Sequence, residues 1–517
     1  MSKTKYIVVL GGNLSGLGKG LVASSIAANL DWLGYKVRYL KLDGYLNTNA
    51  GTINPTEHGE LWVTQDGLEA DMDLGHFERF TGQETNKKSS LTAGKVYSSV
   101  LRKENEGEFL GKTIQMNTHI TQEIVNSIRD SDCDFKIIEV GGTVGDIENQ
   151  LFLEAIRKLK RKEEICVVEL VFVPYLEASK EYKTRLAQVA VAKTRQSGVE
   201  PDIVLARTQR GPTKVPDSIL TKIYNLTDVP TFLAEDLDNV YKIPINIWER
   251  SIIDTILNTF SIERSKENNE KYQSWKTKVN KKYTQKKKIV IAGKYDNGPE
   301  SYKSIVESLY HAGTELDIEI DIDYSHDIAN VNAIIIPGGF GYRGIEDKIN
   351  VIKQARENKI PIIGICYGMQ LMAIEYARNV LNIQDATSEE WDITGTPIIS
   401  YMPGQKEAGK VGTMRLGKYK SSVYAGTPLE DIYKSDFIWE RHRHRLEFLM
   451  STYKKHFNGS ELKIGGTGSI QGEDDRLIEM IYLENQPLFV GVQFHPEFTS
   501  KFLTPHPLFI ELLKKSK

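Results

Sequence analysis

The glycine-rich stretch GGNLSGLGKG, residues 11–20, lies between an apolar run, YIVVLGG (6–12), and an amphipathic run, LVASSIAANLDWLG (21–34). This order predicts a β-strand, a loop whose backbone N–H groups cradle phosphate oxygens, and a helix whose N-terminus faces the phosphates. Lys19 adds a positive charge. A loop of this type usually closes with Gly-Lys-Ser or Gly-Lys-Thr, and the hydroxyl group binds magnesium. Here the last residue is Gly20, so we expect other residues to hold the metal.

Further β-branched runs in the first half predict buried parallel strands. They are VRYLKLD (37–43), FKIIEVGG (135–142), CVVELVFV (166–173) and DIVLART (202–208). Amphipathic stretches separate them, as in an α/β sheet with helices between the strands. In such sheets the functional loops follow the carboxyl ends of the strands. We therefore expect a parallel-sheet domain with a phosphate loop over residues 1–263.

A second α/β domain is predicted over residues 288–517. Its strands are KIVIAGKY (288–295), AIIIPGGFG (333–341), PIIGICYGMQ (361–370) and FVGVQFHPEF (489–498). Residues 264–287 between the two domains are polar and rich in lysine, and we find no hydrophobic periodicity in them. We interpret them as a solvated basic linker, the alternative being a basic patch that contacts phosphate.

Composition narrows the class of protein. A chain of 517 residues, 40% hydrophobic and 26% charged, is typical of a globular protein of two large domains. No apolar run approaches the roughly 18–20 residues of a membrane-spanning helix, and no secretory signal is visible, so we expect a cytoplasmic protein with no membrane partner. A net charge of −3 argues against nucleic acid as a partner. Three widely spaced cysteines cannot form a disulfide framework or a four-ligand zinc site.

One of these cysteines lies in the pattern of a nucleophile. An apolar strand runs into Gly364-Ile365-Cys366-Tyr367-Gly368, and the helical segment MQLMAIEYARNV follows. In a G-x-C-x-G elbow the flanking glycines permit a strained turn and close backbone approach. The thiol then lies at a helix N-terminus, where the dipole favours the thiolate.

The partners that a thiolate needs are also present. His495 and Glu497, in FHPE at another predicted strand end, supply a base and an acceptor that orients it. Backbone N–H groups for an oxyanion are expected in PGGFG (337–341). A lone buried cysteine is more often a small hydrophobic residue than a nucleophile, but the conjunction of all three parts in one α/β domain favours catalysis.

These motifs resemble the class I glutamine amidotransferase domain. The resemblance implies that Cys366 attacks the side-chain amide of glutamine, that His495 transfers the proton and that Glu497 orients His495. It also implies a glutamine site made by Gly339, Tyr367, Gly368, Met369, Gln370, Glu390 and Arg445. The ammonia released needs a consumer, and the first domain is the obvious one.

Carboxylates near the predicted strand ends of the first domain are candidates for magnesium. They lie in DGLEADMDLGH (66–76) and at Glu139, at the end of a strand. Magnesium that bridges nucleotide phosphates is usually held by one or two carboxylates and water. Taken singly, such acidic loops are more often only solvated.

A series of motifs resembles, in order along the chain, the cytidine triphosphate (CTP) synthase family. The motifs are GGNLSGLGKG, KLDGYLN, AGTINPTEHGE, DGLEADMDLGHFERF, LRKENEGEFLGKTIQMNTHIT, EVGGTVGDIEN, PGGFGYRG, GTMRLG, ERHRHR and FHPEFTS. The resemblance covers nearly the whole chain. It implies that ATP phosphorylates the 4-oxygen of UTP and that ammonia from glutamine displaces the phosphate, giving CTP, ADP and phosphate. The family's loop also ends in Gly-Lys-Gly, so the missing hydroxyl is a family trait.

The resemblance also assigns the sites of the first domain. Lys19 and Lys41 are implied in catalysis, and Asp73 and Glu139 in holding Mg²⁺. The implied ATP site contains Gly16, Leu17, Gly18, Lys19, Gly20, Leu21, Asp73, Arg207, Glu235, Asp236 and Leu237. The implied acceptor-nucleotide site contains Ser15, Gln115, Asp146, Ile147, Glu148, Lys183, Thr184, Arg185, Gln188 and Lys222.

Several departures from the family pattern lie on the acceptor side. The family's Lys-Thr-Lys-Pro-Thr-Gln is replaced by Lys-Thr-Arg-Leu-Ala-Gln at 183–188, and its Glu-Ser-x-Pro-Phe by Glu-Asn-Gln-Leu-Phe at 148–152. Gly44 stands where the family usually has proline. Arg185 still carries charge, but its planar fork is not equivalent to an ammonium. Either this is a CTP synthase with a changed UTP loop, or it is a related enzyme that aminates another oxo-nucleotide or carbonyl substrate.

Two further alternatives are weaker. An amidase of the cobyrinate type would need other motifs between residues 40 and 150, and a non-catalytic metabolite sensor or filament protein would be expected to lose the triad or the metal carboxylates. The resemblance implies a homotetramer, with filaments as a further assembly, small-molecule partners, activation by GTP and inhibition by CTP. The segments Leu110-Gly111, GTMRLG (412–417) and GFGYRG resemble those linked to GTP activation.

Overall fold

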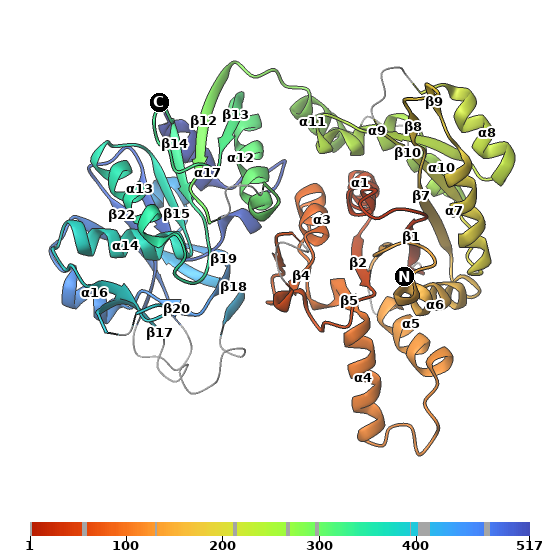
Figure 1. Ribbon diagram of the computed structural model, residues 1–517, viewed down its shortest axis with the longest axis horizontal. Helices are drawn as coiled ribbons and strands as arrows, with labels where there is room; N and C mark the ends of the chain where they lie inside the picture. Colours follow the sequence, from red (N-terminus) through yellow and green to blue (C-terminus); the bar gives the residue numbers. More distant parts are fainter. Residues whose placement is uncertain are drawn as a thin grey trace. The chain divides into compact units, whose positions relative to one another are not determined.

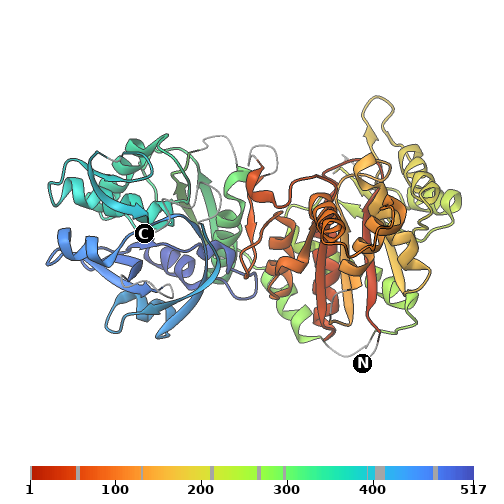
Figure 2. The same cartoon turned by 90° about the horizontal axis from the view of Figure 1, so that it is seen from below.

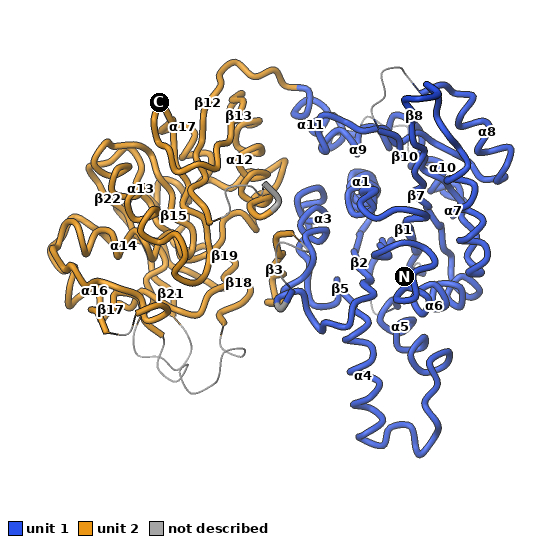
Figure 3. The backbone as a smooth tube through the Cα atoms, viewed as in Figure 1, with its two compact units in different colours: residues 1–53, 69–280 blue, residues 54–68, 281–517 orange. Residues whose placement is uncertain are grey.

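The computed structural model describes residues 3–53, 59–129, 132–209, 215–264, 269–294, 299–392, 394–401, 414–469 and 476–516. The chain forms two compact units (Figure 1, Figure 3). Unit 1 comprises residues 1–53 and 69–280, and unit 2 comprises residues 54–68 and 281–517. In the described part of the chain no helix is both long enough and apolar enough to cross a membrane.

Unit 1 is built on a sheet of seven strands that are all parallel, in the order β11-β10-β7-β1-β6-β2-β5. Figure 2 shows these strands running side by side. Their bounds are β1 Lys5–Gly11, β2 Val37–Asp43, β5 Ser90–Thr92, β6 Phe135–Val140, β7 Ile165–Phe172, β10 Ile203–Thr208 and β11 Thr231–Glu235. Short strands β4 (Glu69–Ala70), β8 (Tyr175–Leu176) and β9 (Glu181–Tyr182) lie outside this sheet. The central strands are almost wholly buried, as expected for a parallel sheet covered by helices.

Helices connect the strands of unit 1 and cover its sheet. They are α1 Lys19–Trp32, α3 Asp73–Thr81, α4 Ala93–Asn105, α5 Thr121–Arg129, α6 Gln150–Lys160, α7 Arg185–Gln196, α8 Asp217–Thr227, α9 Ile243–Glu249, α10 Ile252–Thr259 and α11 Glu270–Val279. One apolar cluster joins α4, α5 and α6 to strands β1, β2, β6 and β7, and a second joins α7 and α8 to β7 and β10. Helix α1 packs against β1, β2 and β6, directly after the glycine-rich loop.

Unit 2 is built on a sheet of nine strands in the order β13-β12-β14-β15-β23-β22-β21-β18-β19. The first five are parallel, and β22, β21, β18 and β19 continue the sheet antiparallel. Their bounds are β12 Gln285–Ile291, β13 Ile318–Asp323, β14 Ala333–Ile336, β15 Ile362–Ile365, β18 Arg415–Val423, β19 Phe437–His444, β21 Leu462–Gly468, β22 Leu477–Leu483 and β23 Phe489–Val492. The small strands are β3 Trp62–Val63, β16 Ala386–Ser388, β17 Thr396–Tyr401 and β20 Leu446–Glu447.

The parallel strands of unit 2 lie between two helical layers. Ile334 and Ile336 of β14 pack with α13 (Ile345–Glu357) and α14 (Tyr367–Asn379). Ala333 and Ile335, which alternate with them, pack with α12 (Lys303–Leu316) and α17 (Pro507–Lys515). The remaining helices are α15 Pro428–Tyr433 and α16 Met450–His456.

The predicted linker contains a packed helix. In α11, Tyr272, Trp275 and Val279 are buried at positions i, i+3 and i+7. Nε1 of Trp275 donates a hydrogen bond to the backbone oxygen of Tyr241 at 2.8 Å, and its ring centroid lies 5.5 Å from that of Trp32. The prediction of a solvated linker over 264–287 is therefore wrong for 270–279, because the lysines between these positions hid a helical pattern.

A second difference concerns residues 59–68, which were predicted within the first domain but belong to unit 2. The side chain of Trp62 is fully buried, with its ring centroid 5.1 Å from that of Phe498. The backbone oxygen of Val63 accepts a hydrogen bond from Nη1 of Arg441 at 3.0 Å. Burial of this large apolar ring explains why the segment packs with a sheet far away in the sequence.

Candidate active sites

Cys366 lies on a strained turn between β15 and α14. Its φ of 53° is in the left-handed region, which L-residues rarely adopt, and it is buried. Its backbone N–H donates to the oxygen of Val492 at 2.7 Å. A Cβ on Gly364 would lie 2.7 Å from the carbonyl carbon of Gly368, and a Cβ on Gly368 would overlap the oxygen of Ile336. The two glycines are therefore needed for the close packing of strand, turn and helix.

His495 and Glu497 follow β23, the strand next to β15 in the sheet. Nδ1 of His495 lies 2.7 Å from Oε1 of Glu497, and both side chains are buried. Burial alone would lower the pKa of His495, but the charges of Glu497 and Cys366 outweigh it and raise the pKa to about 10. Protonated His495 thus donates Nδ1–H to Glu497 at neutral pH. Its Nε2 has no partner of good hydrogen-bond geometry in the described residues, which leaves it available to the thiol.

Near Cys366, sequence reasoning missed Gln493 and found Gly338 only as part of PGGFG (337–341), the segment predicted to supply oxyanion donors. Gln493, fully buried, donates from Nε2 toward Sγ of Cys366 at 3.7 Å. A Cβ on Gly338 would lie 2.9 Å from Cε1 of His495 and 3.8 Å from the Cβ of Cys366, so this glycine leaves room for the imidazole. A polar residue at the end of an otherwise apolar strand was the available signal for Gln493.

The residues predicted to bind glutamine fall into two groups. Gly339, Tyr367, Glu390 and Arg445 surround the loop after β14. The Gly341 N–H donates to Oε1 of Glu390 at 2.9 Å, the Tyr367 hydroxyl donates to the Gly341 oxygen at 2.6 Å, and a Cβ on Gly339 would lie 3.7 Å from the Tyr367 ring. Burial raises the pKa of Glu390 and Arg445 opposes this shift. Nε of Arg445 is buried without a hydrogen-bond acceptor in the described part of the chain.

The second group comprises Gly368, Met369 and Gln370, which have contacts within unit 2. Nε2 of Gln370 donates to the oxygen of Leu446 and to Oε1 of Gln493, both at 3.0 Å. Met369 is fully buried against Gly491, where a Cβ would lie 2.7 Å from Cγ of Met369. Gly368 has no side chain. The Met369 side chain and the amide nitrogen of Gln370 are therefore engaged by contacts within the protein.

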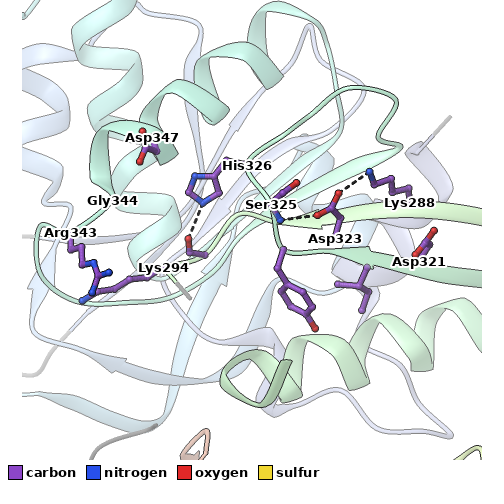
Figure 4. Close-up of a pocket in the computed structure, with 12 residues that line it drawn as sticks. Lys288, Lys294, Asp321, Asp323, Ser325, His326, Arg343, Gly344 and Asp347 are labelled. Carbon is purple, nitrogen blue, oxygen red and sulfur yellow. Dashed lines mark hydrogen bonds and ion pairs between the residues drawn. The ribbon is translucent and has the colours of Figure 1, made fainter. Parts of the chain in front are cut away.

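A pocket of about 1020 Å³ in unit 2 is separate from these residues (Figure 4). It is lined partly by Lys288, which pairs with Asp323 at 2.8 Å, and by His326, whose Nε2 donates to the oxygen of Gly293 at 2.9 Å. None of the predicted triad or glutamine residues is among those that line it in the described chain. Volume alone therefore does not locate the chemistry.

In unit 1, the glycine-rich loop joins β1 to α1. Gly16 and Gly18 have φ of 73° and 83°, and Gly18 precedes the first turn of α1. Ser15 and Gly16 are exposed, while Leu17 is buried and Leu21 is half-buried. Nζ of Lys19 donates to the oxygen of Gly142 at 2.8 Å. Burial lowers the pKa of Lys19, and the charge of Glu139 partly offsets this.

The place of the missing Ser/Thr side chain is taken by Asp73. A Cβ on Gly20 would overlap the carboxyl group of Asp73 and would lie 3.0 Å from the Cβ of Asp73. Nζ of Lys41 forms ion pairs with Asp73 and with Oε1 of Glu139, the latter at 2.9 Å. Tyr39 donates its hydroxyl to Oε2 of Glu139. Gly20 thus admits a carboxylate from α3 to the first turn of α1.

Lys41 is surrounded by carboxyl groups. Burial raises the pKa of Asp43 and of Glu139 to about 7 and also raises that of Asp71. Burial would raise the pKa of Asp73 as well, but Lys41 outweighs it and lowers the pKa to about 2. No group of three or more potential metal ligands occurs in the described residues. Two neighbouring carboxylates beside a phosphate loop nevertheless fit magnesium, which takes one or two carboxylates, water and phosphate oxygens.

Most residues of the predicted acceptor site follow the carboxyl ends of the adjacent strands β6, β1 and β7. Ser15 follows β1. Asp146 and the exposed Ile147 and Glu148 follow β6, and Oδ2 of Asp146 accepts from N and Oγ1 of Thr143, both at 2.8 Å. The start of α7, after β7, contains Thr184, Arg185 and Gln188. Nε2 of Gln188 donates a hydrogen bond to Oγ1 of Thr184 at 3.0 Å. Lys183 forms an ion pair with Glu181. Gln115 precedes α5, and Lys222 lies on α8.

The predicted adenine-side residues form a separate group at the carboxyl ends of β10 and β11. Arg207 pairs with Asp236, and Glu235 accepts from Nη2 of Arg250 at 2.6 Å. Leu237 follows Asp236. In the described ranges no hydrogen bond or ion pair joins these residues to residues 15–21, so protein contacts alone do not bring the two groups together.

Two of the departures in sequence are neighbours. The buried Asn149 donates from Nδ2 to the oxygen of Gly141 at 2.7 Å. A Cβ on Gly44 would lie 2.6 Å from the Cβ of Glu148 and 3.0 Å from Oδ1 of Asn149. The glycine at 44 therefore accommodates the turn that contains Asn149.

The fold and these two centres define a protein that combines a class I glutamine amidotransferase unit with a phosphate-loop synthetase unit. A family model described as CTP synthase N-terminus matches residues 5–262, and one described as glutamine amidotransferase class-I matches residues 296–515. The chain belongs to the CTP synthase family. The predicted family and fold class are thereby confirmed.

Relatives match over the full length. A CTP synthase of Aquifex aeolicus (strain VF5) is 42% identical over 531 residues, covering 99% of this chain and 98% of that protein. A CTP synthase of Pelagibacter ubique (strain HTCC1062) is 42% identical over 542 residues, covering 99% of each chain. Among solved structures, the acivicin-bound glutaminase domain of Trypanosoma brucei CTPS is 29% identical and covers 44% of this chain and 93% of that one, with a TM-score of 0.41.

Proposed function

We propose that this protein makes CTP from UTP, with ATP as phosphoryl donor and glutamine as nitrogen donor. The observation that carries the proposal is the presence, in one chain, of a Cys366–His495–Glu497 centre and of a phosphate loop with a carboxylate, Asp73, against Gly20. Full-length similarity to CTP synthases supports it and favours it over amination of another carbonyl substrate.

In the glutaminase half-reaction, the thiolate of Cys366 attacks the side-chain carbonyl carbon of glutamine. N–H groups of the loop after β14 stabilise the oxyanion. His495 protonates the leaving nitrogen, the C–N bond breaks, and ammonia and a glutamyl thioester form. Water, deprotonated by His495, then attacks the thioester and releases glutamate and the thiol. Glu497 keeps the imidazole oriented throughout.

In the synthetase half-reaction, the backbone of 16–21 and Lys19 hold the phosphates of ATP at the N-terminus of α1. Mg²⁺, held by Asp73 and Glu139, would neutralise charge on the transferred phosphoryl group. Lys41 keeps these two carboxylates together. Transfer of the γ-phosphoryl group to the 4-oxygen of UTP creates a good leaving group, and ammonia then displaces phosphate at C4.

In this proposal both nucleotides bind at the carboxyl ends of the parallel strands of unit 1. We place the triphosphate acceptor among Ser15, 146–148 and 183–188, and the adenine beside Arg207 and 235–237. Arg185 at the first turn of α7 supplies a cation and an N-terminus suited to phosphate. Lys222 on α8 and Gln115 complete the expected acceptor set.

Assembly and control belong to the same proposal. We propose a homotetramer in the cytoplasm, activated by GTP. Leu110 is 87% exposed and available to a ligand or a second subunit. In GTMRLG, residues 412 and 413 lie outside the described residues, and Arg415 is buried and paired with Glu479 at 2.6 Å. We therefore expect Arg415 to hold β18 in place and not to contact GTP directly.

Product analysis tests the proposal. Purified protein with ATP, Mg²⁺, UTP and GTP is supplied with glutamine or with ammonia, and CTP and glutamate are measured separately. CTP should form from both nitrogen sources. Cys366→Ala should abolish glutamine-dependent CTP while ammonia-dependent CTP remains, and Asp73→Asn should abolish CTP from both sources while glutamate release remains. Folded wild-type protein that makes no CTP from either source would refute UTP as the acceptor.

A further inference from the structure

Tyr367, the residue after the nucleophile, has a contact that the reaction steps above do not use. Its side chain is buried, and its hydroxyl donates to the oxygen of Gly341 at 2.6 Å. Its ring lies beside Gly339, and Nζ of Lys348 lies 5.8 Å from the ring centroid. Tyr367 thus connects the first turn of α14 to the loop that follows β14.

Gly341 is bound by two side chains and has little packing of its own. Its N–H donates to Glu390 at 2.9 Å, its oxygen accepts from Tyr367, and its φ is 74°. A Cβ on Gly341 would meet nothing within 4 Å among the atoms of the structure. Because a glycine has no side chain to pack and its backbone is permissive, the two hydrogen bonds restrain the position of this half-buried residue.

The two bonds differ in what happens when glutamine binds. Glu390 is expected to meet the substrate, so its carboxylate must serve both the substrate and the Gly341 N–H. The Tyr367 hydroxyl belongs to the residue next to the nucleophile, and within the described residues its hydrogen-bond partner is the oxygen of Gly341. Burial, followed by the charge of Glu390, raises the pKa of Tyr367, so the hydroxyl stays a donor across the working pH range.

We propose that Tyr367 is a positioning residue. Through the oxygen of Gly341 it holds the loop after β14, residues 337–341, whose N–H groups are expected to stabilise the oxyanion. The proposal rests on the glutaminase role of Cys366, His495 and Glu497. Because oxyanion donors act only when they are fixed relative to the attacked carbonyl, a loosened loop should slow the chemical step more than it weakens substrate binding. The thiol itself should be unaffected.

The test is Tyr367→Phe in the full-length protein, which removes one oxygen atom and keeps the ring. We expect kcat for glutamine hydrolysis to fall about 10–100-fold, at or below the lower end of the roughly 100–1000-fold range for removal of an oxyanion donor, because the donors are loosened and not removed; KM should change less than about threefold. The rate of Cys366 alkylation by iodoacetamide and the rate of ammonia-dependent CTP formation should equal those of the wild type.

Tyr453→Phe is the matched control. It removes another partly buried tyrosine-to-carbonyl hydrogen bond of unit 2, from the Tyr453 hydroxyl to the oxygen of Leu462 at 2.7 Å. It should leave kcat unchanged while lowering the thermal midpoint as much as Tyr367→Phe does. The proposal is overturned if Tyr367→Phe keeps kcat within about twofold, if KM carries the whole effect, or if alkylation slows in parallel with hydrolysis.

Failure of the proposed function gives a different pattern. Wild-type protein that releases no glutamate, or Cys366→Ala protein that still releases it, refutes the glutaminase assignment itself. An active wild type with an inactive Cys366→Ala variant and an unaffected Tyr367→Phe variant refutes only the role of Tyr367.

Discussion

Replacing Gly20 with serine would give the loop the residue that phosphate loops usually have, and we expect it to inactivate the synthetase unit. The serine Cβ would overlap the carboxyl group of Asp73 and lie 3.0 Å from its Cβ. Gly20 is buried and the Lys41 side chain is only 6% exposed, so Asp73, whose side chain is 23% exposed, must move toward solvent and leave its ion pair with the buried Lys41. Separating a buried pair typically costs about 3–5 kcal/mol.

If about 3–4 kcal/mol of this cost is felt in the transition state, kcat/KM for ATP falls about 10²–10³-fold. The assay is ammonia-dependent CTP formation at saturating UTP, because it bypasses unit 2. Gly20→Ala should be as inactive as Gly20→Ser, since the Cβ is the cause. Glutamate release should continue in both variants.

A double-mutant cycle isolates the overlap. In an Asp73→Gly background neither the carboxyl group nor the Cβ of residue 73 is present, so adding Gly20→Ser should cost ATP binding less than about threefold. A Gly20→Ser variant that keeps ammonia-dependent activity within about threefold of the wild type would refute the reasoning. It would mean that the hydroxyl replaces Asp73 and does not collide with it.

Three other predictions concern single residues. Gly338→Ala puts a Cβ 2.9 Å from Cε1 of His495 and should lower glutaminase kcat about 100-fold, measured as glutamate release, with ammonia-dependent CTP retained. Glu497→Gln removes the charge that raises the pKa of His495, so Cys366 alkylation by iodoacetamide should slow at pH 7 and recover as pH rises; a pH–rate profile that matches the wild type contradicts this. Burial raises the pKa of Glu169 from 4.5 to about 7, so its stabilising proton is fully held below pH 4.5 and lost as pH rises through 7. Glu169→Gln should therefore raise the free energy of unfolding, obtained from urea titrations, by up to about 3 kcal/mol relative to wild type at pH 8, and not at pH 4; equal differences at both pH values would refute it.

The two motifs that we assign to catalysis could be predicted from the sequence because local contacts require their residue types. In the elbow, Gly364 and Gly368 are required by contacts within a few residues and with the adjacent strand, so strand, glycine and cysteine occur in a recognisable order. The parallel strands were readable because strands buried on both faces are continuously apolar.

Contacts between distant parts of the chain could not be predicted from the sequence. Trp275 is buried by Trp32 and Tyr241, and Trp62 by Phe498, so the packing of both depends on partners that no local pattern specifies. Met369 was predicted beside glutamine because the family resemblance implies it. Which way its side chain points is determined by α14 packing on Gly491.

Glycine has the same task in both centres, and this explains the unusual end of the phosphate loop. At Gly20 the space of an absent side chain is occupied by Asp73, and at Gly338 it borders the imidazole of His495. In each case the functional group comes from a distant segment and approaches the backbone more closely than any Cβ would allow. A serine side chain at position 20 and a carboxylate from α3 would each place an oxygen atom at the first turn of α1. They cannot both be present, because they would occupy the same space. Gly-Lys-Gly is on this account a complete motif whose last part is Asp73, 53 residues further along the chain.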